Sequence, residues 1–102
     1  MRRESRIDFE AVNSTALVHL PYLIRQWLPQ GRLEGVEWVA LNPMRDDRRL
    51  GSFKINTRTG QWADFATGDR GGDMISLVAY LEGVPRAKAA RRLADILGEN
   101  YA

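Results

Sequence analysis

The stretch Trp62-Ala-Asp-Phe-Ala-Thr-Gly-Asp-Arg-Gly-Gly-Asp73 carries three glycines and three aspartates and leads directly into an apolar segment. Glycine favours tight turns, and an aspartate just before an apolar helix favours an N-cap. The stretch matches neither common glycine-rich phosphate-binding pattern, G-x-x-x-x-G-K-S/T or G-x-G-x-x-G. Its aspartates also lack the alternate spacing of a calcium loop. We therefore interpret it as a structural turn that ends in a helix cap at Asp73.

The residues before this stretch predict a β-hairpin. Residues 52–56 alternate apolar and polar side chains, as a half-buried strand does. Residues 57–60 have the composition of a hairpin loop, with Gly60 at the position that needs a positive φ, and residues 61–65 form the paired strand. A further strand is expected over residues 36–41. The sheet is therefore expected to be small and antiparallel, with about three strands.

Helices are predicted on both sides of these strands. From Ile7 to about Leu28 the leucines recur at helical spacing, and Pro21 favours the first turn of a second helix in this region. After the opening stretch, one helix is expected over residues 74–82. A last helix is expected over residues 86–97, with Gly98 at its C′ position. The predicted fold class is α+β.

Length and composition fit a single domain over residues 1–102, with an N-terminal helical segment over residues 1–31. The chain has 44% hydrophobic and 27% charged residues, which is ordinary globular composition. It has no cysteine, so disulfides and thiolate metal sites are excluded. No apolar run approaches the roughly 20 residues of a membrane span, and no secretory signal is evident. We therefore expect a cytoplasmic protein without membrane contact.

The residue types do not support a free-standing enzyme. Nucleophilic catalysis needs a serine or cysteine beside a base, and the single histidine, His19, lies in the helical region. Asp64, Asp69 and Asp73 are close in sequence, but the last two flank a tight turn, where aspartate is favoured by its own backbone hydrogen bonds. We expect neither catalysis nor a cofactor.

Basic residues gather in two segments although the net charge is only +2. The first segment contains Arg45, Arg48, Arg49, Lys54 and Arg58, and the second contains Arg86, Lys88, Arg91 and Arg92. Such clusters can form a face that binds a polyanion. A solvated surface is the alternative interpretation.

The pair Ser52-Phe53, the spacing Trp62-x-x-Phe65 and the triplet Gly71-Gly72-Asp73 follow one another in an order known from one family. With these motifs, residues 36–98 resemble the zinc-binding domain at the N-terminus of DnaG-type bacterial primases. Residues 42–73 look especially like N-terminal segments of phage- and plasmid-type primase–helicase proteins. The resemblance implies a zinc-ribbon-like domain that contacts single-stranded template DNA.

The four positions that correspond to zinc ligands in that family are occupied by Pro43, Asp46, Asp64 and Thr67. None is a cysteine or histidine, so a tetrahedral structural zinc is not supported. We expect instead that Asp46 or Asp64 forms an ion pair that replaces the metal; the candidate partners are Arg45, Arg48, Arg49 and Arg70. A hard cation held by Asp46, Asp64 and Asp69 is the alternative.

The sequence-based hypothesis is a non-catalytic module that binds single-stranded DNA, either accessory to a phage- or plasmid-type primase or as its N-terminal part. The residues expected to contact phosphates are Arg45, Arg48, Arg49, Lys54, Arg58 and Arg70. Trp62, on the face opposite Phe65, is the expected stacking residue, and a core tryptophan is the alternative. The competing function is a protein–protein adaptor that docks on a primase core or helicase through apolar residues between Leu17 and Leu28.

Overall fold

The computed structural model describes residues 7–45 and 48–101, and within them it contains four helices and one antiparallel sheet of five strands. The helices are α1 (Phe9–Val18), α2 (Leu20–Trp27), α3 (Met74–Glu82) and α4 (Arg86–Tyr101). The strands, in spatial as well as chain order, are β1 (Gly31–Glu34), β2 (Glu37–Ala40), β3 (Phe53–Asn56), β4 (Trp62–Asp64) and β5 (Arg70–Gly71). The predicted α+β class is confirmed, whereas the expected number of about three strands is too low.

The two strands missing from the prediction are the edges of the sheet. β1 returns into β2 through a turn at Gly35 and Val36, and Gly35 has a φ of 64°, which a residue with a side chain rarely adopts. β5 has only two residues and lies in the part of the glycine-rich stretch after Phe65, for which the sequence predicts only a turn. Both edges are short and polar, so neither carries the apolar alternation by which strands are recognised.

An aspartate or a proline marks the start of three of the helices, as the sequence predicts for Pro21 and Asp73. Asp8 caps α1 by accepting a hydrogen bond from the backbone of Ala11, and Pro21 lies in the first turn of α2. Asp73 caps α3, whose bounds agree with the predicted residues 74–82, and Gly83 ends that helix with a φ of 67°.

The end of α4 differs from the prediction. The helix continues through Gly98 to Tyr101 instead of stopping at a C′ glycine. Glycine inside a helix costs about 1 kcal/mol relative to alanine, which does not by itself end a helix whose other residues favour it.

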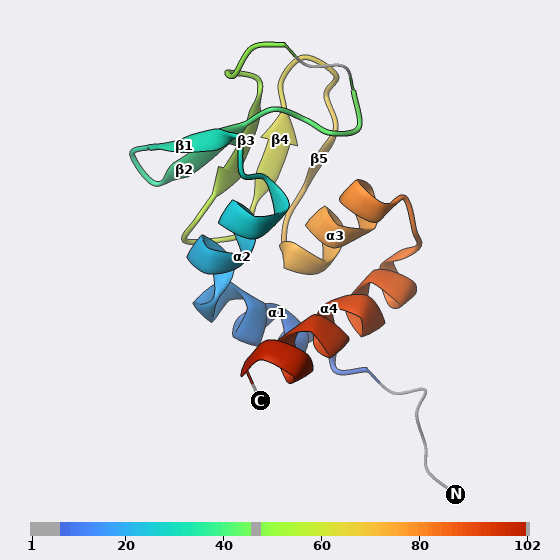
Figure 1. Cartoon of the computed structure of the whole chain (residues 1–102). Coiled ribbons are helices and arrows are strands. Elements are labelled where there is room, and N and C mark those ends of the chain that lie inside the picture. Colours follow the sequence, from blue (N-terminus) through green and yellow to red (C-terminus); the bar gives the residue numbers. More distant parts are fainter. Residues whose placement is uncertain (1–6, 46–47, 102) are drawn as a thin grey trace, which may run out of the picture.

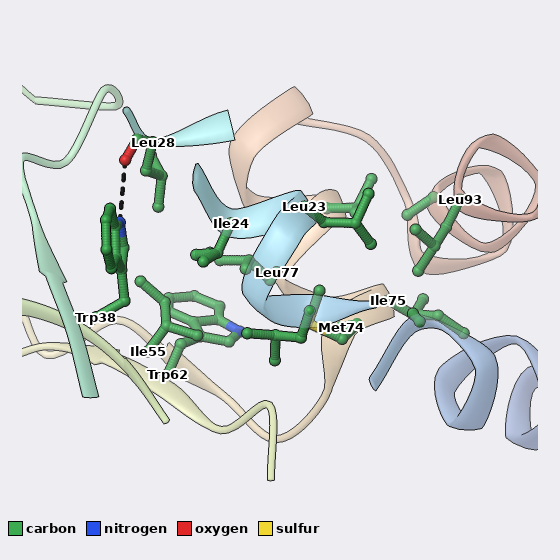
Figure 2. Packing of buried hydrophobic residues seen from close by; sticks show 14 of the residues in the cluster. Leu23, Ile24, Leu28, Trp38, Ile55, Trp62, Met74, Ile75, Leu77 and Leu93 are labelled. Atoms are coloured by element: carbon green, nitrogen blue, oxygen red, sulfur yellow. Dashed lines mark hydrogen bonds between the residues drawn. The ribbon is translucent and has the colours of Figure 1, made fainter. Parts of the chain in front are cut away.

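One face of the sheet is covered by helices, with α2 and α3 next to it and α1 and α4 beyond them (Figure 1). Trp38, Ile55 and Trp62 are cross-strand partners on this face and are at most 5% exposed. In Figure 2 they lie against side chains of α2 and α3, and the Trp38 Nε1 donates a hydrogen bond to the Leu28 carbonyl at 3.0 Å. These contacts attach the sheet to the helical layer.

None of the described helices combines the length and the apolar character needed to cross a membrane.

Candidate nucleic-acid interface

The register of the sheet aligns one residue from each strand across the face that the helices leave uncovered. Arg32 pairs with Val39, Val39 with Lys54, Lys54 with Ala63, and Ala63 with Arg70. We call these five residues the cationic row. Strands lie about 4.8 Å apart, so Lys54 is about 10 Å from each of the two arginines, measured between backbones. Within the described part of the chain, neither Lys54 nor Arg70 forms an ion pair, whereas Arg32 contacts Glu34.

Three members of the cationic row, Lys54, Ala63 and Arg70, line an open groove of ≈ 570 Å³ on the uncovered face. Besides Lys54 and Arg70, its lining includes Glu37, Asn56, Gln61 and Phe65. The groove therefore combines unpaired cations, hydrogen-bonding side chains and one aromatic ring on a single face of the sheet.

Phe65, not Trp62, is the aromatic residue available to a ligand on this face. Its side chain follows β4 on the uncovered side and is 71% exposed, and the Lys54 Nζ lies 5.9 Å from its ring centroid. Trp62 is 5% exposed; its ring centroid lies 4.6 Å from that of Tyr80, and its Nε1 donates a hydrogen bond to the Ser76 Oγ at 2.8 Å. This corrects the expectation that Trp62 stacks on bases, because its ring belongs to the core.

The predicted phosphate-binding residues are not all brought together. Lys54 and Arg70 share the groove. Arg48 and Arg49 are exposed in the connection that leads into β3, and Arg58 is exposed in the loop that leaves β3, so they lie toward opposite ends of that strand. Arg32 is not among the residues predicted from the sequence. Placing it on this face requires recognition of the β1–β2 turn at Gly35.

Arg45 has a structural role in a buried network around Asp64. The Asp64 carboxylate is fully buried and accepts hydrogen bonds from Arg45 Nε at 2.9 Å, Asn42 Nδ2 at 2.7 Å and the Ala66 amide at 2.8 Å. Burial alone would raise the pKa of Asp64, but these hydrogen bonds and the charge of Arg45 outweigh it and lower the pKa to about 2. The predicted ion pair is thus confirmed at Asp64, one of the positions where the primase resemblance places a zinc ligand.

The other three positions of that set contribute no described metal-binding cluster. Pro43 and Thr67 are exposed, and Asp46 lies outside the described residues. Among the residues that the structure describes, no three histidine, aspartate or glutamate side chains gather closely enough to hold a metal ion. Asp69, part of the alternative cation site, accepts a hydrogen bond from the Tyr80 hydroxyl at 2.9 Å.

The Gly-Gly-Asp triplet is explained in part by packing. Asp73 caps α3 and also binds Arg86 through two hydrogen bonds of 2.6 and 3.1 Å, and Asn13 at 3.0 Å, so it connects α1, α3 and α4. A Cβ at Gly71 would lie 1.7 Å from the Ser76 Oγ. At Gly72 a Cβ would meet nothing within 4 Å. The predicted cap at Asp73 is confirmed, the stretch before it contains the short strand β5 and not a turn alone, and Arg86 is engaged by Asp73.

The apolar residues proposed for docking are mostly in the core. Within the segment from Leu17 to Leu28, four side chains are at most 4% exposed: Leu20, Leu23, Ile24 and Leu28. Val18 is 74% and Tyr22 57% exposed, and these two residues form the apolar surface that remains there.

Comparison with known proteins assigns no family to the chain, since no protein-family model and no curated protein matches it. The primase resemblance therefore rests on the motifs quoted above, and any function has to be argued from the geometry of the sheet.

Proposed function

We propose that this chain is a zinc-independent, non-catalytic module that binds single-stranded DNA, as part of or accessory to a phage- or plasmid-type primase or primase–helicase. The observation that carries the proposal is that Lys54 and Arg70 of the cationic row lie with exposed Phe65 in one open groove. Modules of this kind combine cations that follow the phosphates with aromatic rings on which bases stack.

Unpaired strands suit this groove better than a duplex. In a duplex the flat faces of the bases are covered by their neighbours, so the ring of Phe65 would have nothing to stack on. In a single strand each base has an accessible face, and stacking on an aromatic side chain contributes about 1–3 kcal/mol. The uncovered sheet also presents a broad surface rather than a helix or hairpin that could enter the major groove.

Fluorescence anisotropy with a labelled single-stranded oligonucleotide at low salt tests the proposal. The variant Lys54→Gln removes the central cation of the row, and Lys88→Gln makes the same change at an exposed position of α4. We expect Lys54→Gln to weaken binding and to lower the slope of log K against log salt by about 0.7, the value for one phosphate contact on a single strand. Lys88→Gln should match the unmodified chain in both affinity and slope.

Two results would refute the proposal. One is the absence of binding at high micromolar protein in ~50 mM salt, where electrostatic binding is strong. The other is an equal effect of Lys54→Gln and Lys88→Gln, because it would show that binding depends on net charge and not on the groove. Tighter binding to a matched duplex than to the single strand would assign the face to double-stranded DNA instead.

A protein–protein adaptor is the second candidate, favoured by the exposure of Val18 and Tyr22 at the junction of α1 and α2. A pull-down with a primase core or a replicative helicase tests this function. Capture by the unmodified chain that is lost on the double substitution Val18→Ser and Tyr22→Ser, in a chain without DNA affinity, would favour the adaptor.

A further inference from the structure

A second row of side chains runs beside the cationic row on the same face of the sheet. Glu34 pairs with Glu37 across the sheet, and Glu37 pairs with Asn56. The backbone N–H of Asn56 in turn donates a hydrogen bond to the backbone carbonyl of Gln61 at 2.7 Å. We call Glu34, Glu37, Asn56 and Gln61 the carboxylate–amide row. Its members lie two residues along their strands from those of the cationic row, a backbone separation of about 7 Å. Carboxylates and carboxamides are among the side chains that recognise the edges of bases.

Within this row, Glu37 is the charged residue without an ion-pair partner among the residues that the structure describes. The Glu34 carboxylate accepts a hydrogen bond from the Arg32 Nε at 2.8 Å and forms an ion pair with it, whereas the Glu37 carboxylate makes no hydrogen bond or ion pair with any residue that the structure describes. The two glutamates are direct cross-strand partners, and like charges opposite each other destabilise a sheet. A carboxylate in a groove with Lys54 and Arg70 also repels phosphates. The first effect lowers the stability of the sheet and the second weakens the binding of phosphates. A glutamate at this position is therefore unfavourable unless its carboxylate makes a specific contact with the ligand.

We propose that Glu37 selects bases with an exocyclic amino group, which cytosine, adenine and guanine have and uracil and thymine lack, in the strand bound to the groove; this inference rests on the proposed function. Phosphates on the cationic row leave the bases of some nucleotides over the carboxylate–amide row, about 7 Å away along the strands. There the Glu37 carboxylate accepts a hydrogen bond from an amino group, as carboxylates do from cytosine. Uracil and thymine place a carbonyl oxygen at the same position, so the carboxylate rejects them by repulsion.

The same groove thus has two sides with different roles. Phe65 lies beyond the cationic row on the side away from Glu37, because it neighbours Ser52 at the start of β3 whereas Glu37 pairs with Asn56 at its end. Stacking on Phe65 accepts every base, and the carboxylate–amide row discriminates among them. Base preference and overall affinity therefore depend on different residues.

The test compares oligodeoxycytidylate with oligodeoxyuridylate of about 12 nucleotides, within the range of site sizes of small single-strand-binding domains. The two bases differ in the exocyclic group in question and share the same ring size. We expect the unmodified chain to bind the cytosine oligonucleotide about fivefold more tightly, the lower end of what one specific base contact supplies. In Glu37→Gln the ratio should fall to about one, and binding of the uracil oligonucleotide should strengthen because a negative charge has left the groove. Glu10→Gln, at an exposed position of α1, should keep the original ratio.

Equal affinity of the unmodified chain for both oligonucleotides would overturn this inference and leave the proposed function standing. So would a Glu37→Gln variant that strengthens both complexes by the same factor, because Glu37 would then act only through its charge. Failure to bind either oligonucleotide would overturn the proposed function itself, and the inference with it.

Discussion

The two faces of the sheet consist of the same strands in the same register, but they have different roles. One face packs against the helices, and the other carries the cationic row. On the covered face the partners across the sheet are Leu33, Trp38, Ile55, Trp62 and Gly71, and on the uncovered face they are the cationic row. The two sets are offset by one residue, which in a strand reverses the direction of the side chain. The first set is mostly buried against helices, and the second presents three cations separated by Ala63 and by Val39, which is itself fully buried. Substitutions on the covered face should therefore change stability, and those on the uncovered face should change binding.

The largest expected effect is at Gly71, on the covered face. In Gly71→Ala the new methyl group would lie 1.7 Å from the Ser76 Oγ and 2.4 Å from the Trp62 Nε1, two atoms that are hydrogen-bonded to each other. The strand or the start of α3 must shift, and we expect a loss of about 3 kcal/mol or more in the free energy of unfolding, the upper range for overpacking. Urea unfolding followed by tryptophan fluorescence measures it.

Gly72→Ala is the matched control for that substitution. A Cβ at Gly72 meets no atom within 4 Å, so the free energy of unfolding should change by less than about 0.5 kcal/mol. Equal destabilisation by the two substitutions would contradict the division of roles between the faces. It would show that the loss of glycine flexibility, and not the close contacts at Gly71, causes the destabilisation.

A smaller effect is expected from Asp64→Asn, which changes the buried network at one end of the sheet. The lowered pKa of Asp64, about 2 against an ordinary 3.8, corresponds to about 2 kcal/mol of stabilisation at neutral pH. Asparagine removes the negative charge. Its side-chain NH₂ group would also point toward Arg45 or Asn42, although both of these side chains donate hydrogen bonds to the carboxylate of Asp64. We expect a loss of about 2 kcal/mol at pH 7, measured by thermal or urea unfolding.

Acid provides a second check on the same residue. Because the pKa of Asp64 is lower in the folded chain than in the unfolded one, its stabilisation is complete above about pH 4 and is lost as the pH falls through about 2. The difference in stability between the unmodified chain and Asp64→Asn should therefore shrink over that interval. A difference that stays constant from neutral pH to about pH 2 would show that packing, and not the ionised carboxylate, is responsible.

Much of the covered face could be predicted from the sequence, because its signals are local. The alternation in residues 52–56, the glycine at Gly60 and the cap at Asp73 each specify their own element, and the structure confirms all three. β1 could not be predicted in the same way. Its residues are mostly exposed and charged, and only their pairing with β2 makes them a strand.

The uncovered face was harder to predict, since a strand pattern separates two faces without saying which one the helices cover. The pattern correctly assigns Trp62 and Phe65 to opposite faces, but the expected stacking role of Trp62 is wrong and the alternative, a core tryptophan, is confirmed. The outcome depends on Ser76 and Tyr80 of α3, which lie 14 and 18 residues further along the chain and contact the indole. Most of the predicted cations lie between Arg45 and Arg58 in the sequence, whereas the three cations of the cationic row come from β1, β3 and β5.

The smallest expected effect on stability, and the sharpest test of the division between the faces, is at Phe65. Its ring is 71% exposed, so Phe65→Ala should change the free energy of unfolding by less than about 0.5 kcal/mol. Binding of single-stranded DNA should nevertheless weaken by about fivefold or more, the loss of one stacked base, and Phe65→Trp should restore it. Tyr22→Ala, at another exposed aromatic residue that lies on α2 and does not line the groove, should leave the anisotropy titration unchanged. If Phe65→Ala binds as tightly as the unmodified chain, the ring is not a stacking surface; binding through the cationic row would then be purely electrostatic and should vanish at high salt.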